Sequence, residues 1–152
     1  MGTRSLTFVY DSYRMNIGKL VHEPIINMYR QYDGYPSGHG AELAEFLFDG
    51  KMTNGIPVGA KGKFFNGMGD LAAQMVAYFK KEAGGFYLYP ISSKECGQDY
   101  EYHIRNIDGE LIITVFNCGV NFFGLTQSEQ HDKIFEGNLS NFAEFCSTEE
   151  LA

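Results

Sequence analysis

Residues 27–46, NMYRQYDGYPSGHGAELAEF, bring chemically versatile side chains together in a short stretch. Arg30 offers a planar set of donors to a phosphate or carboxylate, and tyrosines offer faces for a flat ring. The glycine-rich part leads into a helical pattern, and the first N–H groups of a helix lack partners within it. The stretch predicts an anion site at a helix entrance, formed around Arg30 by Tyr29, Tyr32, Tyr35, Ser37 and His39.

The same stretch also has a structural explanation. Its glycines can serve tight turns, its tyrosines can fill a seam between sheet and helix, and Arg30 can pair with Asp33 or Glu42. Either explanation accounts for these residue types.

A second glycine-bearing loop, NGMGD at 66–70, also leads into a helical pattern. Its free amides and Asn66 could face the same anionic group. The loop does not match the G-x-G-x-x-G motif of dinucleotide-binding folds, so a flexible helix entry explains it as well.

Arg105 lies in another predicted strand, whose alternation places Glu101, His103 and Arg105 on one face. A solvated sheet face would explain this pattern, and so would a ligand-binding face shared with Tyr87 and Tyr89. We adopt the ligand-binding possibility and include Tyr87 and Arg105 in the predicted site. Arg30 and Arg105 then bind negative charge, Tyr29, Tyr32 and Tyr87 contact a ring, and Ser37, His39 and Asn66 serve as polar anchors.

No enzymatic motif stands beside these residues. The four histidines, His22, His39, His103 and His131, form none of the pairings of zinc hydrolases or two-histidine phosphodiesterases. The three cysteines, Cys96, Cys118 and Cys146, are widely spaced and predict neither a disulfide framework nor a metal pair. We therefore predict no catalytic residues, no metal and no cofactor.

The composition narrows the possible partners. The 152 residues include 12 Lys plus Arg and 19 Asp plus Glu, a net charge of −7. This charge disfavours duplex nucleic acid, which needs a basic face. No apolar run approaches the ~18 residues of a membrane span and no signal peptide is seen, so a cytoplasmic protein without membrane contact is predicted.

Periodicity predicts one α+β domain over residues 1–152, an antiparallel sheet of about five strands with two to four helices packed on it. Strand patterns cover residues 3–11 and 24–32, which should pair antiparallel, and 85–90. Residues 99–106 and 109–116 should form a hairpin around the turn at 107–109.

Helical patterns cover 41–48 and the stretch from Asp70, a plausible N-cap, to Lys81. Residues 51–65 between them read as a long loop. The C-terminal part predicts a helix broken at Gly137, with two capping-box patterns, Thr126 with Glu129 and Asn141 with Glu144.

Four segments, MYRQYDGYPSGHG, NGMGDLAAQMVAYFK, GGFYLYP and DYEYHIRN, together resemble a family of small, mostly uncharacterised proteins of bacteriophages and prophages. The resemblance runs from Gly2 to about Phe116, and the chain departs from it at residues 13–19 and in its C-terminal segment. It implies no catalytic residues. It implies a context, because small phage proteins without enzymatic motifs often inhibit host defence, some by sequestering nucleotide second messengers inside oligomers.

Residues and resemblance together predict a non-catalytic phage protein that binds a small anionic, nucleotide-like ligand in the host cytoplasm, as an anti-defence sponge. The aromatic surplus, 13 Phe and 10 Tyr, and the loop at 51–65 suggest a homo-oligomer. Two alternatives stay open. One is an enzyme acting on nucleotides or phosphoesters, with His39 or His103 as acid/base, and the other is an inhibitor whose acidic surface binds a basic host protein.

Overall fold

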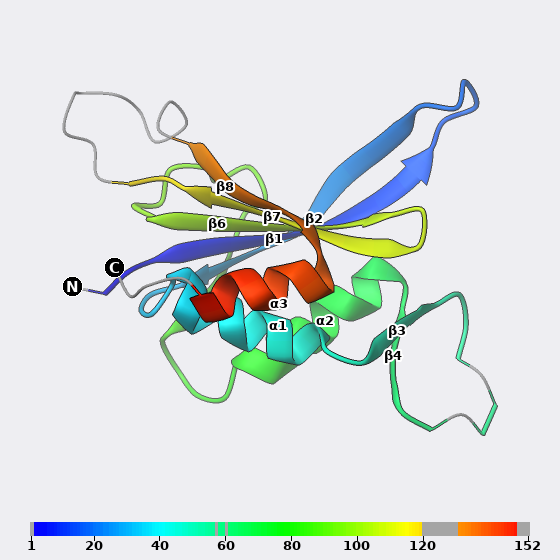
Figure 1. Ribbon diagram of the computed structural model, residues 1–152, viewed down its shortest axis with the longest axis horizontal. Helices are drawn as coiled ribbons and strands as arrows, with labels where there is room; N and C mark the ends of the chain where they lie inside the picture. The colour runs from blue at the N-terminus through cyan, green and yellow to red at the C-terminus, as the bar shows by residue number, and fades with distance from the viewer. Residues whose placement is uncertain (1, 57, 60, 120–130, 149–152) are drawn as a thin grey trace.

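A computed structural model describes residues 2–56, 58, 59, 61–119 and 131–148 of the chain. The fold is α+β, as predicted, and is built on a six-stranded sheet with the order β5-β2-β1-β6-β7-β8 (Figure 1). The strands of this sheet are β1 (Ser5–Arg14), β2 (Leu20–Arg30), β5 (Phe86–Tyr89), β6 (Tyr100–Ile107), β7 (Glu110–Asn117) and β8 (Asp132–Asn138).

The sheet is mixed, although antiparallel pairs dominate it. The predicted β1–β2 pair and the β6–β7 hairpin are both antiparallel, which confirms those two predictions. The β1–β6 pair is parallel, and such a pair needs a long crossover, which here carries β2, the first two helices and β5. Because β1 has a neighbour on each side, residues 5–10 are all buried.

All three α-helices, α1 (Ala41–Leu47), α2 (Gly67–Phe79) and α3 (Leu139–Thr148), lie on one face of the sheet, which we call the helix face (Figure 1). Helix α2 buries Leu71, Met75 and Phe79, a stripe with the predicted four-residue spacing. A single π-helical turn, η1 (Pro36–Gly40), leads from β2 into α1. The main apolar core lies between these helices and the sheet.

The opposite side of the sheet, which we call the far face, carries a smaller core. Leu6, Phe8, Tyr10 and Tyr29 form it, and Tyr89 and Cys96 pack against it. The segment after β5 crosses this face, and Lys94 Nζ lies 5.3 Å from the centroid of the Phe8 ring. Both faces of the central strands are therefore covered.

Two predicted segments have a different structure. Residues 51–65 are not one loop, because β3 (Gly50–Thr53) and β4 (Lys63–Asn66) form a small parallel sheet. Residues 132–138 around Gly137 are strand β8, not helix, because β8 pairs antiparallel with the otherwise open edge of β7. Pairing across the sheet outweighs local helical preference here.

The predicted helix starts also shift. The α2 N-cap position is Asn66, and Asp70 accepts the Asn66 N–H at 2.8 Å from inside the helix. Helix α3 begins at Leu139, where the Asn138 side chain accepts the Asn141 N–H at 3.0 Å. The capping box at residues 126 and 129 lies outside the described residues. No helix in the described ranges combines the length and apolar character needed to cross a membrane.

Candidate functional site

The Arg30 side chain, at the end of β2, points to the helix face and is 4% exposed. Its Nη1 lies 2.7 Å from Glu42 Oε2 and 3.2 Å from His39 Nδ1, and its Nε donates to the Tyr32 carbonyl oxygen at 2.7 Å. The guanidinium carbon is 5.2 Å from the Tyr32 ring centroid and 5.0 Å from that of Phe86. Arg30 is thus paired with Glu42, as the structural explanation predicted.

His39 is completely buried beside Arg30. A guanidinium can only donate, so His39 Nδ1 accepts from Arg30, and Nε2 carries the proton that it donates to Thr7 Oγ1 at 2.7 Å. Burial, with a smaller effect of the Arg30 charge, lowers the pKa of His39 to about 3. The neutral imidazole is a structural link between β1, β2 and η1, and its pKa does not suit a general acid or base near neutral pH.

The glycines of the motif have a packing role. A Cβ atom on Gly38 would lie 2.5 Å from the Asp33 carbonyl oxygen, and one on Gly40 would lie 2.7 Å from Cys146 Sγ. The Gly34 carbonyl accepts a 2.7 Å hydrogen bond from the Tyr102 hydroxyl across the core. Tight backbone packing therefore explains why glycine stands in this turn.

A surface hollow of about 410 Å³ opens beside Arg30, a volume typical of small-molecule sites. We call it the Arg30 hollow. Its walls combine two cations with several aromatic rings and one carboxylate: Arg30, Lys81, Tyr32, Tyr78, Phe79, Phe86 and Glu42. A second hollow of about 240 Å³ shares Tyr32, Lys81 and Phe86 with it and extends along the α2–β5 loop. The two hollows adjoin at these shared residues, and Lys81 lines both.

The predicted site residues do not meet in one place. Tyr29 pairs with Tyr87 and with Leu6 in the sheet, so Tyr29 and Tyr87 lie on the far face, whereas the neighbouring Arg30 lies on the helix face. Arg105 is also on the far face, 4.2 Å from the Tyr10 ring centroid. The prediction of a single niche was wrong, because strand alternation sends Tyr29 and Arg30 to opposite sides.

The other predicted residues are also dispersed. Tyr32 is 46% exposed and lines the Arg30 hollow. The Tyr35 hydroxyl donates to Asp33 Oδ1 at 3.2 Å, and Ser37 Oγ is buried without a partner in the described part of the chain. Asn66 lies at the far end of α2, where its Oδ1 accepts the Gly55 N–H at 2.6 Å. Arg30 and Tyr32 are thus the predicted residues that share a hollow.

The far face holds a buried chain of polar side chains that begins at Tyr10. The Tyr10 hydroxyl lies 2.6 Å from His103 Nδ1, and His103 Nε2 lies 3.0 Å from Glu101 Oε1. The other carboxylate oxygen, Oε2, is 2.6 Å from His131 Nε2 and accepts from Gln98 Nε2 at 2.7 Å. We call Tyr10, His103, Glu101, Gln98 and His131 the far-face network.

The protonation states in this network follow from the hydrogen bonds. Burial alone would raise the pKa of Glu101, but hydrogen bonds from His103, His131 and Gln98 outweigh it and bring that pKa to about 2. Ionised Glu101 can only accept hydrogen bonds, so His103 Nε2 donates to it. His103 Nδ1 then accepts a hydrogen bond from the Tyr10 hydroxyl. Burial lowers the pKa of His103, against the opposing effect of Glu101, and burial raises the pKa of Tyr10.

This order of groups is a continuous path of hydrogen bonds from a hydroxyl to a carboxylate. A hydroxyl bonded to a histidine, which is itself bonded to a carboxylate, is the arrangement in which a base activates a nucleophile or an acid. The Arg105 guanidinium over the Tyr10 ring lowers the pKa of the phenol, although burial has the larger effect. Of the two histidines proposed for an enzyme, His103 alone has this setting.

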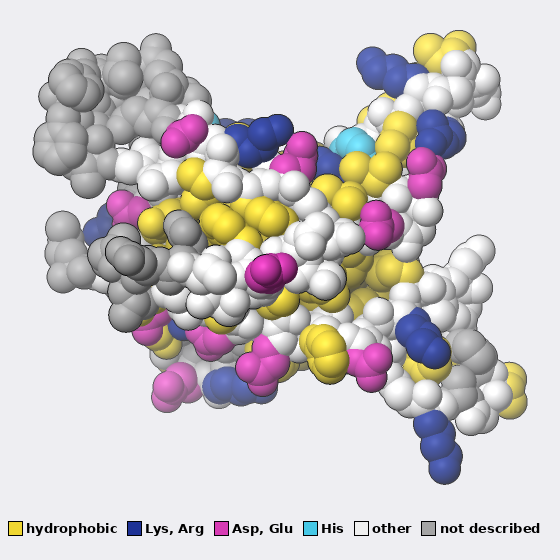
Figure 2. All heavy atoms as spheres, in the orientation of Figure 1, with side chains coloured by type: hydrophobic (Ala, Val, Ile, Leu, Met, Phe, Trp, Pro, Cys, Tyr) yellow, Lys and Arg dark blue, Asp and Glu magenta, His cyan; other side chains and the backbone are white. Residues whose placement is uncertain are grey.

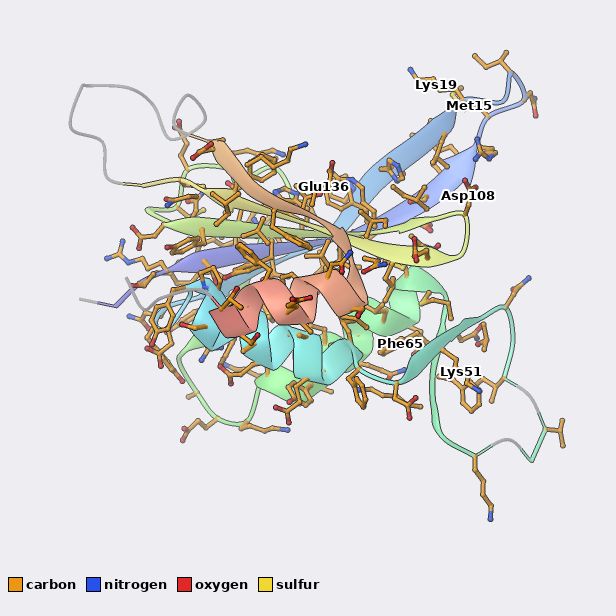
Figure 3. The ribbon with its side chains drawn as sticks, viewed as in Figure 1. Met15, Lys19, Lys51, Phe65, Asp108 and Glu136 are labelled. Carbon is orange, nitrogen blue, oxygen red and sulfur yellow. The ribbon has the colours of Figure 1, made fainter. Side chains whose placement is uncertain are left out.

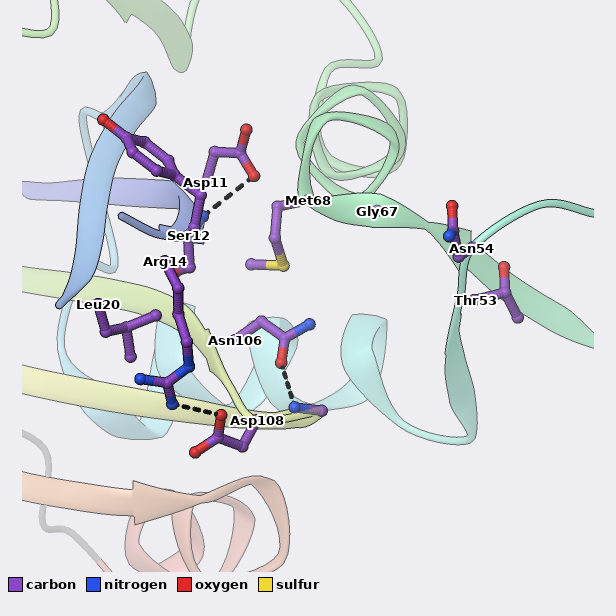
Figure 4. A pocket seen from close by; sticks show the side chains of 12 residues that line it. Asp11, Ser12, Arg14, Leu20, Thr53, Asn54, Gly67, Met68, Asn106 and Asp108 are labelled. Carbon is purple, nitrogen blue, oxygen red and sulfur yellow. Dashed lines mark hydrogen bonds and ion pairs between the residues drawn. The ribbon is translucent and has the colours of Figure 1, made fainter. Parts of the chain in front are cut away.

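A third hollow, of about 390 Å³, lies between the β1–β2 hairpin, the β6–β7 turn and the start of α2 (Figure 4). Arg14 Nη2 and Asp108 Oδ1 are 2.8 Å apart at its wall. Met15 and Lys19 mark the tip of the projecting hairpin and Lys51 the β3–β4 lobe, with the space-filling surface hollowed between them (Figures 2 and 3). Both charges of the pair are more than half exposed, so water screens them and the cleft offers little for an anion.

The sequence pattern did not indicate the other members of the far-face network, Tyr10, Gln98 and His131. The alternation in β6 correctly placed Glu101, His103 and Arg105 on one face. This shared face was the sequence feature that pointed to the far-face network. Tyr10 joins it through the parallel β1–β6 pair, and His131 joins it just before β8. Neither feature was predicted.

No protein-family model matches the chain, and neither the curated proteins nor the solved structures gave a significant match. The resemblance to phage proteins accordingly stays a prediction. The geometry of the Arg30 hollow and of the far-face network is what a functional proposal can be built on.

Proposed function

We propose that the protein binds a small anionic ligand with an aromatic ring, of the nucleotide class, in the Arg30 hollow and holds it unaltered. The observation that carries this proposal is the composition of the hollow, whose walls place Lys81 and Arg30 beside Tyr32, Tyr78 and Phe86. A nucleotide requires cationic donors for phosphate and aromatic faces for the base.

Lys81 and Tyr32 make the principal contacts in this proposal. Lys81 is exposed, and its Nζ makes a long 3.4 Å hydrogen bond to the Ala77 carbonyl oxygen, which a ligand phosphate can replace. The Tyr32 ring is 46% exposed and rests on Arg30. Arg30 keeps its own partners and contributes by holding that ring and adding positive potential.

The biological role we propose is sequestration of a nucleotide second messenger. The resemblance to phage proteins supports it, and the pKa of about 3 for His39 makes that histidine unsuited to act as an acid or base near neutral pH. Storage without turnover requires only that the hollow binds its ligand tightly. A homo-oligomer in the host cytoplasm is part of the same proposal.

Calorimetric titration with a panel of cyclic and linear nucleotides tests the binding proposal. Lys81→Ala should weaken binding about tenfold or more, as expected for a hydrogen bond between charged groups. Lys61→Ala, which removes the same charge from an exposed position on the 54–62 loop, is the matched control and should bind like the wild type. Equal affinities in the two variants would exclude the Arg30 hollow as the site.

A second function, nucleotide or phosphoester processing, is favoured by one observation, the Tyr10–His103–Glu101 chain. Here His103 takes the Tyr10 proton and Glu101 stabilises the resulting imidazolium. Incubation followed by heat denaturation separates the two functions. Recovery of unchanged nucleotide supports storage, whereas a product that forms with wild type and not with His103→Gln supports an enzyme.

A further inference from the structure

We infer that Glu101, Cys118 and His131 form a binding site for a divalent transition metal of the zinc class. The site lies on the far face, on the other side of the sheet from the Arg30 hollow. It is independent of nucleotide binding. Residues 101, 118 and 131 match no ligand-spacing motif, so spacing alone does not predict the site.

Sheet topology brings the three ligands together. Glu101 stands near the start of β6, Cys118 directly follows β7 and His131 directly precedes β8. The β6–β7 and β7–β8 pairs are both antiparallel, so these three strand ends meet at one end of the sheet. The potential ligand atoms all lie within 4.8 Å of one another, and His131 Nε2 is 2.6 Å from Glu101 Oε2.

The donor set selects the class of metal. A thiolate with an imidazole and a carboxylate suits zinc and similar ions, whereas magnesium and calcium require oxygen ligands. Ligand atoms at about 2.0–2.3 Å from a tetrahedral zinc stand about 3.3–3.8 Å apart. The present spacing would reach this if His131 Nε2 and Glu101 Oε2 moved apart from 2.6 Å and any pair near the 4.8 Å limit moved closer.

The burial of the three ligands and the hydrogen bonds that surround them distinguish this cluster from a chance grouping of side chains. Cys118 is 0% and Glu101 4% exposed, while the His131 side chain, at 21% exposed, leaves a path from solvent. Glu101 Oε1 is held by His103, and His103 in turn by Tyr10. The Cys118 N–H donates to the Asp99 carbonyl oxygen at 2.7 Å. Such outer hydrogen bonds orient ligands in metal sites.

Three protein ligands leave one position of a tetrahedral ion open. A zinc ion here would therefore carry a water molecule or a ligand atom beside the far-face network. The arrangement resembles catalytic zinc sites in ligand number rather than closed structural ones, which use four protein ligands.

Cobalt substitution tests the site directly, because Co²⁺ replaces Zn²⁺ and a Co–thiolate bond gives a charge-transfer band in the near ultraviolet. Untagged protein, stripped with a chelator and titrated with Co²⁺, should bind one equivalent and show this band. Zn²⁺ should then displace Co²⁺ and abolish it. Cys118→Ala should lose the band, whereas Cys96→Ala, which removes a partly buried thiol near Tyr29 on the same face, should keep it.

His131→Ala keeps the test decisive if Cys118→Ala fails to fold, since His131 is partly exposed and outside β8. This variant should bind Co²⁺ at least tenfold more weakly, with a circular dichroism spectrum like that of the wild type. Lys81→Ala should bind metal normally. Absence of a thiolate band in the wild type, its survival in Cys118→Ala, or unchanged affinity in folded His131→Ala would each overturn the proposal.

Discussion

The two faces of the sheet carry two polar networks built from similar residues but organised in opposite ways. On the helix face, Arg30, His39 and Thr7 are buried and fully occupied with one another and with Glu42. On the far face, Tyr10, His103 and Glu101 lead to the buried Cys118 and to His131, which is partly exposed. The first network links β1, β2 and η1, whereas the second is the one for which we propose a metal site. A conspicuous sequence motif can therefore be structural, and residues without a motif can form an equally extensive buried network.

Of the tests proposed here, acidification should have the largest effect on the free energy of unfolding, through the helix-face network. The pKa of His39 is about 3 in the folded state against an ordinary value of 6.5, so the unfolded chain takes up this proton first. Stability is full above pH 6.5 and falls as the pH drops towards 3. The free energy of unfolding should decrease by about 1.4 kcal/mol per pH unit from this group, about 4–5 kcal/mol in all.

Urea unfolding between pH 6.5 and 4.5 measures this slope, above the window from 4.5 to about 2 in which Glu101 titrates. His39→Gln can keep both hydrogen bonds and should reduce the slope by about 1.4 kcal/mol per pH unit. His103, whose pKa is also lowered, adds its own part and remains in that variant. An unchanged slope in His39→Gln would show that the helix-face network does not control acid stability.

The second largest difference in the free energy of unfolding should follow removal of the arginine on each face. Arg30→Ala should lower the free energy of unfolding by about 3 kcal/mol, because His39 loses its donor and Tyr32 and Phe86 lose the side chain between them. Arg105→Ala, which removes a half-buried guanidinium over Tyr10, should cost about 1 kcal/mol or less. Urea unfolding at neutral pH compares the two, and equal losses would contradict the division of roles between the faces.

The packing of the motif turn is tested by glycine substitution. Gly38→Ala would place a methyl group 2.5 Å from the Asp33 carbonyl oxygen and should destabilise the protein by about 1–3 kcal/mol. Gly69→Ala in α2 meets nothing within 4 Å and should be neutral or stabilising by up to about 1 kcal/mol. Thermal unfolding distinguishes these outcomes. Unchanged stability in Gly38→Ala would contradict the conclusion that close packing requires glycine in this turn.

The smallest effect is expected at the hydroxyls that begin each network. Tyr10→Phe should cost about 1 kcal/mol, because it leaves an acceptor unpaired on His103, which is buried but still 7% exposed. Thr7→Val, at a fully buried site, should cost more, about 1–3 kcal/mol, since the His39 Nε2–H then lacks an acceptor. Chemical denaturation should show a larger loss of stability in Thr7→Val than in Tyr10→Phe. The reverse order would contradict the assignment of the more stabilising network to the helix face.

Local patterns predicted much of the fold. The alternation in β6 and β7 and the Asp-Gly turn between them gave the hairpin, and the spacing of Leu71, Met75 and Phe79 gave α2. The parallel β1–β6 pair and strand β8 were not predictable in this way. Both depend on partners distant in sequence, which periodicity does not describe.

The site was predictable to the extent that it was local. The pairing of Arg30 with Glu42 was foreseen as one alternative, and Tyr32 does line a hollow with Arg30. The proposed convergence of Tyr29 with Arg30 failed because neighbours in a strand point apart. Cys118 and His131 looked unrelated because only the finished sheet brings the ends of β6, β7 and β8 together.

The central position of β1 has a consequence for how the chain is made. In the parallel β1–β6 pair, Ser5 is the partner of Tyr100, so the β1–β2 hairpin leaves the ribosome long before the strand that will cover its second edge. An unpaired strand edge invites contact with other chains, and long-range pairing is slow. Synthesis of this small protein therefore includes an interval of vulnerability to aggregation, which ends when β6 emerges.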